Sequence, residues 1–341
     1  MQDVVGVLSL ATYIPKQVMT SQELTEKTAI PQQIIENKLG IIQKTIANAE
    51  EHTAWMGIQA AKKAISLANL NSLDIDVVIY IGEEHKEYPL WTAGIYTQEQ
   101  VGATNAWAFD VQLRCSTTVM ALKLAKSLML GDDEIRTILL AGGYRNHDYI
   151  DYSNDRTRFM FNLAAGGGAI ILQKGYGRNL LLATHTISDG SFSEDVAVTA
   201  GGTKYPISPE MITQKKNYLD VFKPKEMKER LEQKSIDNFI KVVREALRKS
   251  GLSINDIDYL ATLHMKRSAH DEILRLLHLD QEQSFYLSNY GHIGQIDQIL
   301  SIELALEQGK IKDGDIVVLV SAGIGYAWSA TVVKWGKNGN E

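Results

Sequence analysis

The residues of this sequence best suited to covalent chemistry are one cysteine and two histidines. Cys115 is the single cysteine in 341 residues, and it stands in Arg114–Thr118, where polar residues open an otherwise apolar helical pattern. A cysteine at a helix N-terminus has its thiolate stabilised by unpaired backbone N–H groups and by the positive end of the helix dipole. An isolated cysteine is more often a small buried hydrophobic residue. This polar context instead favours a nucleophile that exchanges thioesters.

His264 and His292 are the histidines best placed to assist Cys115. His264 follows an apolar strand that begins at Asp258 and stands at its C-terminal end, where the sites of α/β proteins usually form. His292 lies in the turn-rich segment Asn289–Gly294, directly before a helix. The remaining histidines fall on helices or loop-like segments with no partner in view: His52, His85, His147, His185, His270 and His278. No Cys and His spacing suits a metal, so no metal site is expected.

Two glycine-rich segments require an explanation of their own. Ala164–Gly168 precedes a strand, and Ala322–Tyr326 follows a strand without opening a helix. Neither segment fits the strand–GxGxxG–helix context of a dinucleotide site. Their glycines either form turns and close packing or place a backbone N–H beside the nucleophile, where it would complete an oxyanion hole with the N–H of Cys115.

Strands and amphipathic helices alternate along the chain that must position these residues. Short apolar runs predict buried strands at residues 76–81, 138–141, 168–172 and 315–320. Helical periodicity predicts helices at residues 54–70, 117–130 and 236–250. This alternation indicates βαβ units and an α/β fold with a largely parallel or mixed sheet.

The chain also repeats itself at long period. Residues 64–76 match residues 246–258 at five of thirteen positions, and both segments end in Asp-Ile-Asp before an apolar strand. Residues 124–125 and 139–143 match 304–305 and 319–323 at nearly the same offset. We therefore expect a duplicated α/β unit, with halves at residues 1–175 and 176–341. Cys115 then corresponds to Gln295, so pseudo-symmetric packing would bring Cys115 and His292 face to face.

Composition excludes several classes of protein. A net charge of −6 argues against broad nucleic-acid binding. The first residues lack the basic and apolar regions of a signal peptide, and no run of about 18 apolar residues predicts a membrane span. A single cysteine cannot form an internal disulfide. We expect a cytoplasmic enzyme that binds neither nucleic acid nor membrane.

An ordered set of motifs resembles the β-ketoacyl-acyl-carrier-protein synthase III family of the thiolase superfamily. The set comprises Cys115 after Asp110–Gln112, a histidine after a strand of the second half, the turn Tyr290–Gly291 that leads into a helix, and Gly323–Trp328. The resemblance covers essentially the whole chain. It implies a thiolase-like, duplicated, five-layered αβαβα fold and a homodimer.

The same resemblance implies a Cys-His-Asn triad and thioester substrates. Cys115 would be the nucleophile, His264 the second member, and the backbone N–H groups of Cys115 and Ile324 the oxyanion hole. The substrates would be thioesters of coenzyme A or of the phosphopantetheine of an acyl carrier protein, with no permanently bound cofactor.

The sequence departs from the family pattern at the third member of the triad. His292 occupies the Asn position, so the set reads Cys-His-His, which also resembles the elongating synthases of the superfamily. An imidazole N–H can donate to an enolate oxygen as an amide does. His292 can also act as a general base, which an Asn cannot. Asp297, like Gln295, replaces a small residue after His292, and both are expected to contact a polar substrate.

Further substrate contacts follow from the resemblance. The coenzyme A adenine is sandwiched in the family by a Trp and an Arg, whose positions hold Ile34 and Lys38 here. The loop that carries Tyr88 and Trp91 would reach the acyl pocket near the dimer interface and favour a short or flat acyl group. The remaining expected substrate-binding residues are Arg267, Asn289 and Gly325.

Three functions are compatible with these residues. The first is a condensing enzyme of fatty-acid or polyketide-like specialised metabolism, which acylates Cys115 and joins the acyl group to a malonyl-type thioester. The second transfers the acyl group without decarboxylation to an oxygen, nitrogen or carbon nucleophile, with His292 as base. The third is a catalytically silent subunit of a heterodimer, which retention of Cys115, His264 and His292 argues against.

Overall fold

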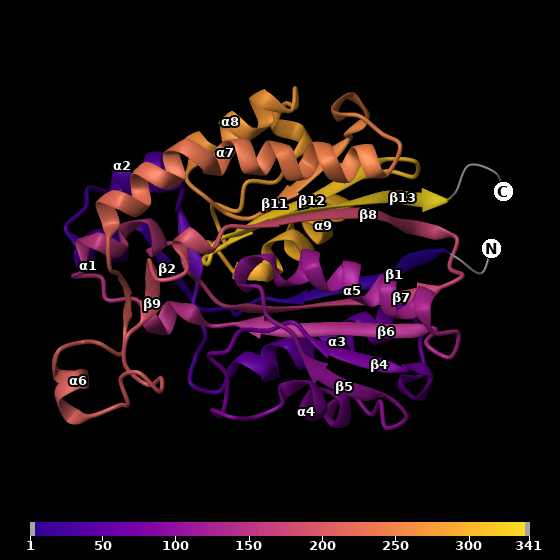
Figure 1. The fold of residues 1–341 in the computed structure, drawn as a ribbon, viewed down its shortest axis with the longest axis horizontal. Helices are drawn as coiled ribbons and strands as arrows, with labels where there is room; N and C mark the ends of the chain where they lie inside the picture. The colour runs from indigo at the N-terminus through magenta and orange to yellow at the C-terminus, as the bar shows by residue number, and fades with distance from the viewer. Residues whose placement is uncertain (1–3, 338–341) are drawn as a thin grey trace.

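A mixed nine-stranded sheet dominates the computed structural model, which describes residues 4–337 (Figure 1). The strands lie in the order β11-β12-β13-β8-β1-β7-β6-β4-β5. In chain order they are β1 (Val5–Tyr13), β4 (Val77–Tyr80), β5 (Trp107–Asp110), β6 (Thr137–Tyr144), β7 (Gly166–Lys174), β8 (Arg178–Ser188), β11 (Tyr259–Thr262), β12 (Ile316–Gly323) and β13 (Ala327–Lys337).

The sheet repeats one strand pattern in the two parts of the chain. In the first part, β1 runs antiparallel to β7, β7 antiparallel to β6, and β6 parallel to β4. In the second, β8 runs antiparallel to β13, β13 antiparallel to β12, and β12 parallel to β11. The two parts join where Gly6 of β1 pairs with Leu180 of β8. The boundary between residues 175 and 176 stays a prediction, because the sheet is continuous across it.

Helices cover both outer faces and separate the two parts of the sheet. The long helices are α3 (Thr53–Leu67), α5 (Thr117–Gly131), α7 (Pro224–Lys249) and α9 (Asp297–Glu307). α3 packs on β1, β6 and β7, and α7 packs on β8, β12 and β13. α5 and α9 contact strands of both parts and lie between them (Figure 1). These contacts give the five layers αβαβα.

Shorter elements complete the fold. They are α1 (Ser21–Thr28), α2 (Gln32–Ile34), α4 (Ala93–Gln100), α6 (Pro209–Thr213), α8 (Arg267–Leu276), β2 (Val18–Thr20), β3 (Gln43–Thr45), β9 (Val196–Val198) and β10 (Leu219–Val221). Between residues 4 and 337 no helix combines the length and the apolar character that crossing a bilayer requires.

All of the strands and helices expected from the sequence are present, and one helix is longer than expected. The strand β6 is buried along its whole length because helices cover both of its faces. The helix expected over residues 236–250 is the C-terminal part of α7, which begins at Pro224. Its first three turns are mostly charged and exposed, so they carry little apolar periodicity.

The glycines of residues 166–168 serve close packing of α3 and α9 on β7. A Cβ atom on Gly167 would lie 2.2 Å from the carbonyl oxygen of Met56 in α3. We expect Gly167→Ala to lower the free energy of unfolding by about 1–3 kcal/mol, because the helix must move away from the strand. Gly177→Ala, where nothing lies within 4 Å of the added atom, is the matched control. Equal urea midpoints for the two variants would contradict this packing.

Candidate active site

Cys115 lies in a single 3-10 turn, Arg114–Ser116, that leads directly into α5. The backbone is held there on the second part of the sheet, since Ser321 Oγ of β12 donates to the Cys115 carbonyl at 2.6 Å. Arg114 has a φ of 50°, in the left-handed region that residues other than glycine rarely adopt. Its guanidinium pairs with Glu83 at 3.3 Å and Glu84 at 2.7 Å. These contacts hold the bend that carries Cys115. Cys115 therefore lies just before the N-terminus of α5, as the sequence predicts.

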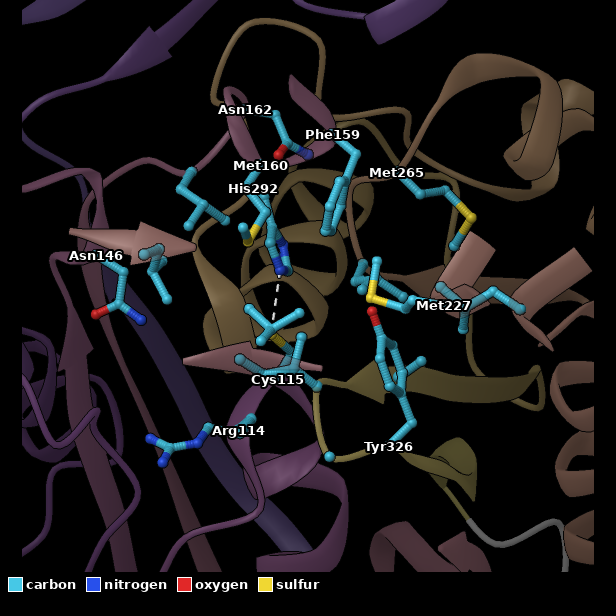
Figure 2. Close-up of a pocket in the computed structure, with 18 of the residues that line it drawn as sticks. Arg114, Cys115, Asn146, Phe159, Met160, Asn162, Met227, Met265, His292 and Tyr326 are labelled. Carbon is cyan, nitrogen blue, oxygen red and sulfur yellow. Dashed lines mark hydrogen bonds between the residues drawn. The ribbon is translucent and has the colours of Figure 1, made fainter. Parts of the chain in front are cut away.

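His292 faces Cys115 across the middle of the molecule (Figure 2). Its Nε2 lies 3.2 Å from the Cys115 Sγ. Its Nδ1 lies 2.6 Å from Oδ2 of Asp297, the first residue of α9. Because a carboxylate only accepts, Nδ1 carries a proton, which leaves Nε2 to exchange a proton with the thiol. The three side chains form a nucleophile, a base and a group that orients the base.

Asp297 is fully buried and receives three hydrogen bonds. Besides His292, the backbone N–H groups of Ile293 and His264 donate to its carboxylate, each at 2.7 Å. Burial disfavours the charged imidazolium of His292. The charges of Asp297 and Cys115 outweigh that effect, so the pKa of His292 lies well above its usual value. His292 is therefore suited to hold a proton beside the Cys115 sulfur.

The turns that lead into α5 and α9 lie side by side. The Thr118 hydroxyl donates to the backbone carbonyl of Gln295 at 2.7 Å, which links the N-terminal ends of the two helices directly. The sequence repeat that aligned Cys115 with Gln295 therefore corresponds to a real contact between equivalent turns. The expectation that Cys115 and His292 face each other agrees with this geometry.

His264 lines the same cavity as Cys115 and His292, but both of its ring nitrogens bond to other groups. Its Nε2 lies 3.0 Å from the Gly40 carbonyl oxygen, and its Nδ1 lies 2.9 Å from Asn162 Nδ2. A carbonyl must accept and an amide nitrogen must donate, so both ring nitrogens are occupied. Burial lowers the pKa of His264 to about 4, which keeps the ring neutral near pH 7. The role of His264 as second member of the triad stays a prediction.

The proposed oxyanion hole is supported by the close approach of β12 to Cys115. A Cβ atom on Gly323 would lie 3.0 Å from the Cys115 backbone nitrogen. Glycine at this position lets the strand end pass directly beside the nucleophile. Ile324 and Gly325 follow it and line the same cavity as Cys115. Their roles stay predictions.

The catalytic pair opens into a cavity of about 1070 Å³. This volume is at the upper end of the range for small-molecule sites. Much of its wall is apolar and comes from α7 and the segments around β9 and β10. Phe159, Met227 and Met265 belong to this wall (Figure 2).

Several expected substrate contacts lie outside this cavity. Tyr88 is 65% exposed, and neither it nor Trp91 lines the wall, so this loop does not limit the acyl group within one chain. Lys38 and Asn289 are exposed away from the cavity, and Arg267 pairs with Asp271 and stacks over Tyr286.

Gln295 and Asp297 turn inward rather than toward substrate. Gln295 is fully buried, and its Nε2 donates to the Gly143 carbonyl at 3.3 Å. Asp297 binds His292 instead of a polar substrate. One sequence signal could have revealed that Asp297 orients His292. Asp297 is an acidic residue that opens a helix five positions after His292, and Gly294 between them allows the chain to turn.

Two family models match the chain. They are the 3-oxoacyl-[acyl-carrier-protein] synthase III model over residues 109–190 and the C-terminal model of the same family over residues 247–335. The chain belongs to the 3-oxoacyl-[acyl-carrier-protein] synthase III family. Cys115 falls in the first match, and His264 and His292 fall in the second. The chain is therefore a member of a family of condensing transferases.

Relatives named β-ketoacyl-[acyl-carrier-protein] synthase III match this family member almost from end to end. The protein from Clostridioides difficile is 28% identical over 97% of this chain and 98% of its own length. The protein from Caldanaerobacter subterraneus is 26% identical over 97% of this chain and 98% of its own length.

Solved structures show the same fold. The synthase III from Thermus thermophilus has a TM-score of 0.84 at 23% identity, covering 98% of this chain and 100% of its own. OleA from Xanthomonas campestris, solved with lauric acid and lauroyl-CoA, has a TM-score of 0.82 at 17% identity. The match covers 98% of this chain and 100% of the OleA chain. This member of the synthase III family therefore has the thiolase-type fold.

Proposed function

We propose that this chain is an acyltransferase that carries an acyl group on Cys115. It takes the group from a thioester of coenzyme A or of a carrier protein and joins it to a malonyl-type thioester in the cytoplasm. The observation that carries this proposal is the 3.2 Å contact between Cys115 Sγ and His292 Nε2 at a helix N-terminus. The names of the relatives support the same reaction.

The first half of the reaction acylates the cysteine. The Cys115 thiolate attacks the thioester carbonyl, and the oxygen of the tetrahedral intermediate accepts hydrogen bonds from backbone N–H groups of Cys115 and Ile324. The intermediate collapses and expels the donor thiolate, which takes a proton from the His292 imidazolium. Asp297 holds His292 in the required orientation throughout.

The second half forms the carbon–carbon bond. His292 regains a proton from solvent, which the charge of the neighbouring Asp297 favours. The malonyl carboxylate leaves as CO₂, and the enolate oxygen that forms accepts a hydrogen bond from His292 Nε2–H. The enolate carbon attacks the acyl carbonyl, and the Cys115 thiolate leaves again.

Transfer without decarboxylation is a second candidate, and the same site offers a specific observation for it. Asp297 orients His292 as a base, while His264 presents no free N–H for an enolate. In this reaction His292 would take the proton of a hydroxyl, amine or acidic carbon as that group attacks the acyl-cysteine. The Cys115–His292 contact favours either enzyme over a silent subunit.

Measurement of CO₂ separates the two candidates. Acylated wild-type protein is supplied with a malonyl thioester together with alcohol and amine acceptors, and CO₂ and product are measured together. Condensation predicts that one CO₂ is released for each β-ketoacyl product formed. The His292→Ala variant should release no CO₂ and form no β-ketoacyl product. Acyl transfer to an alcohol or amine with no CO₂ would overturn condensation in favour of the second candidate.

The edge strand β5 supports a homodimer. β5 ends the sheet, so one side of its backbone is unpaired, and Trp107 on it is 51% exposed and stacks on Phe109. We expect two copies to pair along this edge. Trp107→Lys should convert the dimer to a monomer in light scattering, whereas Ile212→Lys, a change at a similarly exposed position on α6, should not. A monomeric wild type, or a dimeric Trp107→Lys variant, would contradict this interface.

A further inference from the structure

The cavity beside Cys115 has two chemically different sides. Figure 2 shows Arg114 and Asn146 on one side of Cys115, with Met227, Met265 and Tyr326 on the other. Glu83, which pairs with Arg114, and Tyr144 also line the cavity. We call these four residues, Glu83, Arg114, Tyr144 and Asn146, the polar wall.

Glu83 is the unusual member of the polar wall. Its side chain is 3% exposed, and within the described part of the chain its one cationic partner is Arg114, at 3.3 Å. Arg114 is shared with Glu84, which it approaches more closely at 2.7 Å. A carboxylate has about four acceptor positions, so Glu83 keeps unused capacity to accept hydrogen bonds.

Tyr144 and Asn146 add further polar atoms to the cavity wall. The Tyr144 ring lies 5.9 Å from the His292 ring, centroid to centroid. The Asn146 Oδ1 is buried and has no hydrogen-bond partner among residues 4–337. A hydrocarbon placed here would cover Glu83 and this oxygen without satisfying them, which is costly.

The opposite side suits the thioester arm. Its apolar wall extends along α7, and exposed cations lie on its rim, namely Arg156, Arg158 and Lys228. These three cations have carboxylate neighbours, and exposed Lys266 also lines the cavity. Such cations could meet the phosphates of coenzyme A or of phosphopantetheine. If the phosphopantetheine arm of the donor enters from this side, the acyl group lies against the polar wall.

We propose that the acyl group carried on Cys115 bears a hydrogen-bond donor, a hydroxyl or an amino group, within a few atoms of its carbonyl. Glu83 and Asn146 are then specificity-determining residues that accept from this group. The inference rests on the proposed acyl transfer and adds the chemical class of the acyl group. A site built to accept such hydrogen bonds rejects an isosteric hydrocarbon strongly.

Binding to the Cys115→Ala variant tests this class without needing turnover. The probes are butanoyl-CoA and its near-isosteres 3-hydroxypropanoyl-CoA and β-alanyl-CoA, and calorimetry gives the dissociation constants. We expect at least one of the polar probes to bind about 10- to 100-fold more tightly than butanoyl-CoA. Adding Glu83→Gln or Asn146→Leu should reduce this preference to less than about threefold, whereas Met227→Leu on the apolar side should preserve it.

Equal or tighter binding of butanoyl-CoA would overturn the proposal, as would a preference that both polar-wall variants leave unchanged. Two substitutions are used because Glu83→Gln also removes a partner of Arg114, next to Cys115. Acylation of the wild type is measured separately by intact mass. Acylation without any preference defeats this inference alone, whereas no acylation by any donor defeats the proposed function.

Discussion

Replacing His292 by alanine should slow the acylation of Cys115 by about 10²–10⁴-fold, the usual contribution of a positioned proton-transfer group. The reason is geometric, since His292 Nε2 is the imidazole nitrogen within reach of the sulfur. Its raised pKa keeps a proton on the ring beside the sulfur. The rate is measured by rapid quenching and intact mass, with one acyl-CoA donor at saturation.

His264→Gln is the matched control for that experiment. Both rings are buried and line the same cavity, but the His264 ring is bonded to Gly40 and Asn162. We expect His264→Gln to leave the acylation rate within about tenfold of wild type, because it moves no proton at the sulfur. If instead His264→Gln stops acylation while His292→Ala does not, the assignment of the base is wrong.

Asp297→Asn should also have a large effect, although Asp297 does not touch the sulfur. An amide can turn its N–H₂ toward Nδ1 and so favour the wrong imidazole tautomer, and a change of this kind at an orienting carboxylate costs on the order of 10⁴-fold in a serine protease triad. It also removes the buried charge that raises the pKa of His292. We expect acylation to slow by about 10²–10⁴-fold.

The pH dependence of the His292 ring distinguishes this role from a structural one. Because loss of the carboxylate lowers the pKa of His292, the ring should lose its proton at a lower pH in Asp297→Asn than in the wild type. An NMR titration of the histidine ring signals measures this change. Asp297→Glu, which keeps the charge, should shift the titration less. An unchanged His292 titration in Asp297→Asn would show that Asp297 does not act through His292.

The fold was largely predictable because its signals are local and occur twice. The apolar strand runs, the helical periodicity and the repeated Asp-Ile-Asp segments each report on nearby residues, and their order implies the layers. The N-terminal part of α7 was missed because its charged residues form the wall and rim of the cavity rather than the core. Met227 and Leu231 on this part face the cavity, and nothing local in the sequence indicates that contact.

The site was predictable in its main pair and not in its details. The internal repeat places Cys115 and His292 at equivalent turns of the two halves. This placement needs only the correct alignment of one half of the sequence with the other. The direction of the His264 ring depends on contacts with Gly40 and Asn162, which lie 224 and 102 residues away in the sequence. The contact between Asp297 and His292 was equally hard to predict, because an acidic residue at the start of a helix can face solvent, substrate or a neighbouring ring.

Peptide mapping after incubation with acyl thioesters tests most directly whether Cys115 carries the acyl group. Wild-type protein is mixed with a panel of acyl-CoA and acyl-carrier-protein donors, quenched, digested and analysed by mass spectrometry. The account predicts one acyl group on the peptide that contains Cys115, and none in Cys115→Ala. A wild-type protein that no donor acylates, or an adduct that persists in Cys115→Ala, would contradict it.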